Sequence, residues 1–190
     1  FSLDGPLDMR YNGRGPGQTA ADLVNSADEE ELVNWLWEYG EEARSRQIAR
    51  ALIRARPIST TSQLARVVES AVGRRRSAIH PATRTFQALR IAVNQELAAI
   101  EMALPAAVEA LRTGGRLAVI SFHSLEDRIV KRFLRRESQD CVCPPSYPVC
   151  RCDHRRTVRL LGRKPTAPTS EEMELNPRSR SAKLRLAEKV

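Results

Sequence analysis

The four cysteines of the chain fall within 12 residues, in the pattern C-x-C-x6-C-x-C. Closely grouped thiols in a reducing compartment are more typical of a metal site than of disulfides. Four thiolates suit a closed tetrahedral zinc site, and the prolines between the two pairs restrict the loop that must bring the sulfur atoms together. The spacing therefore predicts a structural zinc site whose ligands are Cys141, Cys143, Cys150 and Cys152.

A second interpretation of these cysteines stays open. The spacing C-x-C is less usual than C-x-x-C, and Arg151, Arg155 and Arg156 lie close enough in the sequence to activate free thiols or redox pairs. His154 is an alternative ligand in place of one cysteine. A zinc-dependent hydrolase is disfavoured, because four thiolates leave no open coordination position.

Residues 121–128, with the sequence SFHSLEDR, carry a second group of reactive side chains. They follow 117–120, a short apolar run after two glycines that is typical of a buried strand in a parallel sheet. Open α/β folds bind ligands at the carboxyl ends of such strands. The candidate catalytic residues are therefore Ser121, His123, Ser124 and Asp127. The alternative is that they only cap and begin the next helix.

Arginines are concentrated in one segment. From Arg44 to Arg90 the sequence has 11 arginines and one acid, Glu69, whereas the rest of the chain has a net charge of −2. This asymmetry indicates a polyanionic partner, because basic side chains that meet phosphates release counterions and gain affinity. The candidate RNA contacts are Arg46, Arg50, Arg54, Arg74, Arg75, Arg76 and Arg84. The alternative is a solvated helical surface whose arginines pack on neighbours or pair with acids.

The elements that must position these residues fall into three parts. Residues 1–18 are rich in Gly and have no periodicity, which indicates a loop. Residues 19–80 contain four helical segments, the first with a capping box formed by Thr19 and Asp22. Residues 81–190 combine helices with a buried strand and two later strands, and contain the Cys-rich loop at 141–152. This order predicts an α/β fold behind a helical, basic domain.

Helical spacing also predicts two local features. In the second helical segment, the expected apolar stripe consists of Leu32, Val33, Leu36 and Trp37. Pro81 suits the first turn of a long helix, and the expected interruption of that helix lies near Pro105.

Composition limits the class of protein. The chain is 42% hydrophobic, but no apolar run approaches the roughly 20 residues that cross a bilayer. No signal segment opens the sequence, so we expect a cytoplasmic protein with no membrane partner. The chain begins at Phe1 in a loop-like segment, and we therefore expect it to be part of a longer polypeptide.

Six motifs resemble one known family in the same order along the chain. The family is ribosomal RNA small subunit methyltransferase H, also called MraW. The motifs are GPLDMR (5–10), TAADLVN (19–25), YGEEARSRQIARAL (39–52), HPATRTFQALRIAVNQEL (80–97), GGRLAVISFHSLEDRIVKRF (114–133) and NPRSRSAKLRLAEK (176–189).

The resemblance implies the second half of a Rossmann-like class I methyltransferase sheet and an inserted all-helical substrate-recognition domain at 19–80. The implied reaction is S-adenosylmethionine-dependent N4-methylation of a cytidine near the decoding site of small-subunit (16S) ribosomal RNA. The implied partner is that RNA or the 30S subunit, and an oligomer is compatible with it. The implied reaction requires protein groups that hold the target cytosine in position, and Asp8 and Arg10 are further candidates for this role.

The family's cofactor motifs are a Gly-rich loop ending in Gly-Gly-His, an acid after the second strand and Asp-Leu-Gly after the fourth, and they do not occur in this sequence. The Gly-rich segment 12–17 follows no strand, so we assign no cofactor ligand in this chain and expect it to be inactive by itself. A different class stays open, namely a non-catalytic RNA-binding or assembly module with a structural zinc loop.

Overall fold

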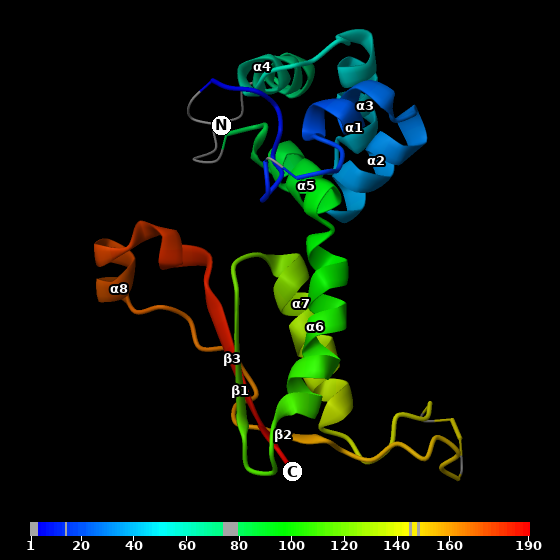
Figure 1. Cartoon of the computed structure of the whole chain (residues 1–190), viewed down its shortest axis with the longest axis vertical. Helices are drawn as coiled ribbons and strands as arrows, with labels where there is room; N and C mark the ends of the chain where they lie inside the picture. The colour runs from blue at the N-terminus through cyan, green and yellow to red at the C-terminus, as the bar shows by residue number, and fades with distance from the viewer. Residues whose placement is uncertain (1–3, 14, 74–79, 145, 148) are drawn as a thin grey trace. The chain divides into compact units, whose positions relative to one another are not determined.

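The computed structural model describes residues 4–13, 15–73, 80–144, 146–147 and 149–190. The chain forms two compact units, Phe1–Glu96 and Leu97–Val190 (Figure 1). Three of the predicted RNA contacts, Arg74, Arg75 and Arg76, lie outside the described residues.

The first unit is helical. Its helices are α1 (Ala20–Ser26), α2 (Glu29–Glu38), α3 (Ser45–Arg54), α4 (Thr61–Val72) and α5 (Thr83–Asn94). The predicted capping box of Thr19 and Asp22 is confirmed, and Asp28 and Thr60 begin α2 and α4 in the same way. Each box satisfies amide groups that a helix start would otherwise leave without partners.

Buried aliphatic side chains hold the first unit together. Leu32 and Leu36 of α2 pack with Ile48 and Leu52 of α3, each 1% exposed or less. The prediction that Trp37 belongs to this stripe is wrong, because its side chain is 60% exposed. The sequence predicted a loop before residue 19, and Leu7 anchors that loop in the same core at 1% exposed.

The predicted long helix is two helices. Gln95, with a left-handed φ of 49°, separates α5 from α6 (Glu96–Ala110), because a residue in that conformation ends a right-handed helix. The interruption predicted near Pro105 is wrong, since Pro105 lies inside α6. Helix α5 packs on α1 and α2, so the first unit extends to Glu96 and not to the boundary predicted at residue 80.

The second unit contains a small sheet. Its elements after α6 are β1 (Arg116–Ser121), α7 (Ser124–Glu137), β2 (Val158–Leu160), α8 (Ser170–Leu175), the 3-10 helix η1 (Pro177–Ser181) and β3 (Lys183–Lys189). The strand order is β1-β3-β2, and both pairings are antiparallel. The two later strands were predicted correctly, whereas the short helices between them were not. The chain thus combines helices with a small antiparallel sheet, and the pairing that the described residues give 117–120 is antiparallel, where a parallel sheet was predicted.

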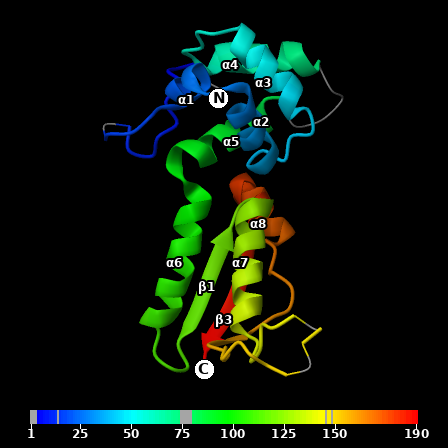
Figure 2. The ribbon, with the colours of Figure 1, turned by 90° about the vertical axis from the view of Figure 1, so that its right-hand side faces the viewer.

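One face of this sheet is covered. Helices α6 and α7 lie on the same side of β1 and β3 (Figure 1), and Leu104, Val108, Val130 and Leu134 pack there with strand residues. The apolar run predicted an interior strand, and within the described residues β1 (Figure 2) pairs with β3 alone. It forms an edge of the described sheet, and Ala118 and Ile120 on its other face are exposed. Within the described residues, only alternate residues of β1 are therefore covered.

Within the described residues, no single helix is both long and apolar enough to span a membrane, although α5 and α6 taken together meet the criteria of length and composition.

Candidate functional site

The polar cluster after β1 is built on the start of α7. His123 is the N-cap residue, and its Nδ1 accepts a hydrogen bond from the Glu126 amide at 3.4 Å. In return, Glu126 Oε2 accepts hydrogen bonds from the amides of Phe122 at 2.7 Å and His123 at 3.3 Å. The helix cap that the sequence left open as an alternative is therefore present, with His123 in the role usually taken by Ser, Thr or Asp.

The imidazole also contacts the carboxylate. His123 Nε2 lies 3.3 Å from Glu126 Oε1, and both side chains are less than one-fifth exposed. Burial raises the pKa of Glu126, but the hydrogen bonds from His123 and from the Phe122 amide outweigh it and lower that pKa overall. This arrangement holds the imidazole in one orientation at the end of β1, with a carboxylate beside it.

Asp127 joins α7 to β3. Arg185 donates to both carboxylate oxygens, at 2.7 Å to Oδ1 and 3.1 Å to Oδ2, and Lys183 Nζ lies 3.5 Å from Oδ2. The hydrogen bond from Arg185 lowers the pKa of Asp127 against the opposing effect of burial. Both oxygens of this candidate acceptor are therefore engaged within the protein.

The two candidate serines differ. Ser121 is buried and its Oγ donates to the Lys183 carbonyl at 3.4 Å, which ties the end of β1 to β3. Ser124 is exposed in the first turn of α7. Sequence reasoning missed Phe122, which is 54% exposed between these residues. The alternation of Ile120 and Phe122 was the available signal, because residues two apart on a strand share a face.

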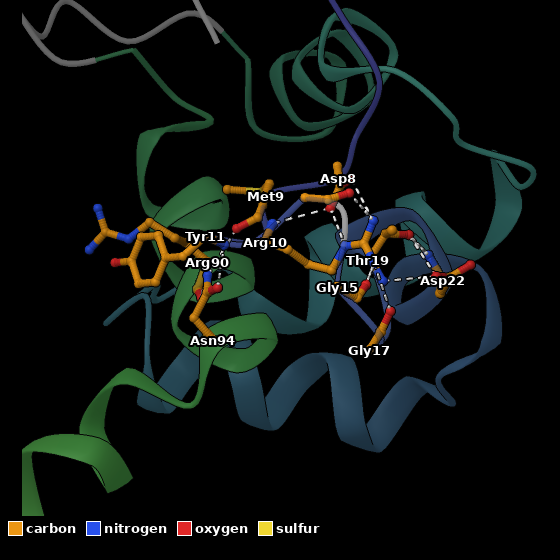
Figure 3. A network of polar contacts seen from close by, with 11 residues as sticks. Asp8, Met9, Arg10, Tyr11, Gly15, Gly17, Thr19, Asp22, Arg90 and Asn94 are labelled. Atoms are coloured by element: carbon orange, nitrogen blue, oxygen red, sulfur yellow. Dashed lines mark hydrogen bonds and ion pairs between the residues drawn. The ribbon is translucent and has the colours of Figure 1, made fainter.

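A polar network organises the loop before α1 (Figure 3). Arg10 makes a bidentate pair with Asp8, at 2.6 Å from Nε to Oδ1 and 2.8 Å from Nη2 to Oδ2. The hydrogen bond from Arg10 lowers the pKa of Asp8. The two residues that the sequence offered as positioning groups are thus partners of each other.

The Gly-rich segment 12–17 closes around the same guanidinium. The carbonyls of Gly15, Gly13 and Gly17 accept from Arg10 at 2.7, 3.0 and 3.3 Å. A nucleotide or phosphate cradle presents amides and not carbonyls to its ligand. The described residues of this segment thus direct carbonyl oxygens at Arg10.

Asn94 fixes the other side of the network. Its Nδ2 donates to the Met9 carbonyl and its Oδ1 accepts from the Tyr11 amide, both at 2.9 Å. Met9 has a positive φ of 66°, a conformation that these contacts stabilise. The loop is consequently held on α5 at the point where the polypeptide leaves that helix.

The predicted RNA-contacting arginines are not equivalent. Arg50 pairs with Glu29 at 2.7 Å, and Arg84 donates to the Glu41 carbonyl at 2.9 Å. Arg46 and Arg54 are exposed on α3. Arg46 borders a hollow of about 590 Å³ between α2 and α3, together with Trp37, Asn34 and Gln47. An exposed indole next to a guanidinium suits a nucleobase and its phosphate, which is a feature that sequence reasoning missed.

A second basic segment was also missed. Residues 128–164 contain 11 basic residues and three acids, but residues 1–43 contain ten acids and two arginines. The net charge of −2 for the chain outside Arg44–Arg90 adds the acidic residues of 1–43 to the basic residues of 128–164, so it does not reveal the second basic segment. A window of about 40 residues along the sequence would have revealed it.

The cysteines form one cluster. The Sγ atoms of Cys141, Cys143, Cys150 and Cys152 all lie within 4.8 Å of one another. The Val142 amide lowers the pKa of Cys152 to about 6. The Cys143 amide lowers the pKa of Cys141, but hydrogen bonds with the neighbouring thiols raise it to about 12. These contacts thus favour a thiolate at Cys152 over one at Cys141.

These observations define a mixed α/β protein with a helical unit, cationic surfaces suited to a polyanion and an ordered polar cluster at a strand end. The model of the MraW methylase family matches residues 1–190. The chain therefore belongs to the MraW methylase family.

Curated relatives carry a consistent description. Proteins from Thermomicrobium roseum, Dehalococcoides mccartyi and Heliobacterium modesticaldum are 57%, 54% and 50% identical to this chain over its full length. Each is named ribosomal RNA small subunit methyltransferase H. The chain spans 59%, 54% and 62% of their respective lengths.

Proposed function

We propose that the protein of which this chain is part transfers a methyl group from S-adenosylmethionine to N4 of a cytidine near the decoding site of 16S ribosomal RNA. The observation that carries the proposal is the family match over the whole chain, together with relatives named as methyltransferases of small-subunit ribosomal RNA. Within this proposal the chain supplies RNA-binding and base-positioning groups.

The methyl donor is assigned to residues outside this chain. The most glycine-rich loop directs its carbonyls at Arg10, and a cationic sulfonium cofactor gains nothing from the guanidinium at its centre. The described residues therefore do not fit the cofactor at this loop. When bound elsewhere in the longer polypeptide, S-adenosylmethionine supplies an electrophilic methyl group.

The residues after β1 are suited to holding the target base. The amino nitrogen of cytosine is a poor nucleophile because its lone pair is delocalised into the ring, so the base must be held with that nitrogen directed at the methyl group. We assign this contact to Ser124, with the exposed ring of Phe122 as an apolar support. His123 and Asp127 act as positioning residues, through Glu126 and Arg185 respectively.

The hollow between α2 and α3 is proposed as an RNA contact. Arg46 would meet a phosphate and the exposed Trp37 would stack on an unpaired base, with Asn34 and Gln47 near the base edge. Arg50 is less available, since it pairs with Glu29. Arg54 borders a second hollow with Arg66 between α3 and α4 and extends the same cationic surface of α3.

The test of the activity uses the full-length polypeptide and 30S subunits that lack the modification. Radiolabelled methyl transfer, followed by nucleoside mass spectrometry, should detect N4-methylcytidine. A full-length protein that binds 30S subunits but yields no methylated cytidine would leave the non-catalytic RNA-binding module as the better description.

The RNA contact is tested in this chain with a labelled 16S fragment that contains the decoding region. Trp37→Ala should weaken binding about 5- to 150-fold without changing its salt dependence, because it removes one stacked base. Arg46→Ala should reduce the slope of log K against log salt by about 1, because it removes one phosphate contact. Arg180→Ala, an exposed arginine of η1, is the matched control. If Arg46→Ala and Arg180→Ala reduce the slope equally, the hollow between α2 and α3 is not a specific RNA contact.

A further inference from the structure

The four sulfur atoms are spaced as a tetrahedral metal site requires. Cys150 Sγ lies 3.6 Å from Cys152 Sγ, which in turn lies 3.8 Å from Cys141 Sγ. A zinc–thiolate bond of about 2.3 Å gives sulfur–sulfur separations of about 3.8 Å in a regular tetrahedron. Disulfide sulfurs, by contrast, are about 2.0 Å apart. The two C-x-C segments therefore face each other across a space of ligand dimensions.

Backbone amides are directed at the sulfurs. The amides of Val142 and Arg151 donate to Cys152 Sγ and Cys143 Sγ at 3.4 and 3.3 Å, and the amide of Cys143 donates to Cys141 Sγ at 3.4 Å. Hydrogen bonds from amides stabilise thiolate charge and orient the sulfur lone pairs, as partners of ligands do in metal sites. The loop backbone thus directs amide donors at three of the four sulfur atoms.

The described residues of this loop bury little apolar surface. It connects α7 to β2, and its larger apolar side chains are exposed, with Val142, Tyr147 and Val149 at 37%, 54% and 68%. A segment that buries so little apolar surface cannot offset its conformational entropy by packing. A metal bound by four side chains can supply that free energy.

We propose that Cys141, Cys143, Cys150 and Cys152 bind one structural zinc ion, which orders the segment between α7 and β2. Each thiol releases its proton to solvent as it binds the metal, and the completed site carries a charge of −2. Arg151, Arg155 and Arg156 flank the site in the sequence and offset that charge. His154 is not needed as a ligand, because its Nε2 lies 3.1 Å from the Arg136 carbonyl.

The ordered segment belongs to the second basic segment, residues 128–164, so a bound metal would also affect the proposed RNA binding. Bound metal would hold Arg151, Arg155 and Arg156 within one short loop, where phosphates could meet them together. The metal site itself does not depend on that function. Its test therefore uses metal content and loop order, and does not use methyl transfer.

The experiment measures zinc in the whole chain purified under reducing conditions without chelator. We expect one equivalent by elemental analysis, and Co²⁺ exchange should produce the thiolate charge-transfer and visible bands of a tetrahedral site. The double substitution Cys150→Ser with Cys152→Ser should abolish both signals. The control Val149→Ala, in the same loop, should retain them.

Loop order provides an independent readout for variants that fold. Removal of zinc by a chelator should accelerate proteolysis within 138–157 and leave cleavage of the first unit unchanged. Zinc below one-tenth of an equivalent, with no uptake by the reduced protein, would overturn the inference. Disulfide-linked cysteine pairs in protein isolated from the cytoplasm of an expression host would also overturn it, in favour of a redox role.

Discussion

The pair of Asp127 and Arg185 offers the sharpest test of how the second unit is held together. Both side chains are 11% exposed, and Arg185 donates to both carboxylate oxygens. Removing one partner of a buried pair leaves the other charge without compensation, which costs about 3–5 kcal/mol when burial is complete. The remaining exposure reduces this, so we expect Asp127→Ala to destabilise the second unit by about 2–3 kcal/mol.

The chain allows the effect to be assigned to one unit. Its two tryptophans, Trp35 and Trp37, both lie in α2, so tryptophan fluorescence follows the first unit. Hydrogen exchange of peptides from β1, α7 and β3 follows the second. A loss of 2–3 kcal/mol should accelerate exchange there about 30- to 150-fold, while the fluorescence midpoint stays unchanged.

The pH dependence has a defined sign. The folded pKa of Asp127 is lowered, so its contribution is complete above the unfolded value near 3.8 and is lost as the pH falls through the folded value. Asp127→Ala should therefore flatten the acid limb of the stability curve of the second unit. Asp140→Ala is the control, because its pair with Arg156 is exposed and should contribute less than about 1 kcal/mol. If Asp127→Ala and Asp140→Ala have equal effects, or if Asp127→Ala shifts only the fluorescence midpoint, the reasoning is wrong.

Two further predictions concern single positions. His123→Ala should destabilise the second unit by about 1 kcal/mol because it removes the cap of α7, and His123→Asn should restore the stability. Hydrogen exchange of α7 measures both effects. If the Asn variant does not restore protection from exchange, His123 does not act as the cap. Gly40→Ala should destabilise the first unit by about 1–3 kcal/mol, since a Cβ there would lie 2.6 Å from the Leu36 carbonyl oxygen and 2.9 Å from that of Arg84; an unchanged urea midpoint by tryptophan fluorescence would contradict it.

Local signals in the sequence predicted local structure well. The capping box at Thr19 and the two late strands follow from short-range chemistry, and the structure has both. The cluster of cysteines was predictable for the same reason, because both pairs lie in one short loop. Spacing alone did not give the positions of the sulfur atoms, which the structure brings within 4.8 Å of one another.

Features that depend on distant neighbours were not predictable. An apolar run such as 117–120 looks the same in an interior strand as in an edge strand with one face covered. Trp37 is 60% exposed although helical spacing placed it on the apolar stripe, because periodicity alone does not show which part of that stripe a neighbouring helix covers. The role of Asp127 likewise depends on Arg185, which lies 58 residues away in the sequence.

The edge position of β1 has a practical consequence. Within the described residues this strand pairs with β3 alone, so the amide and carbonyl groups of its other edge have no strand partner there. A six-residue edge without proline, next to the exposed side chains of Ile120 and Phe122, is a template for the addition of another strand. Expressed by itself, this polypeptide should self-associate through that edge, and a longer polypeptide that supplies a covering strand should be the more soluble material.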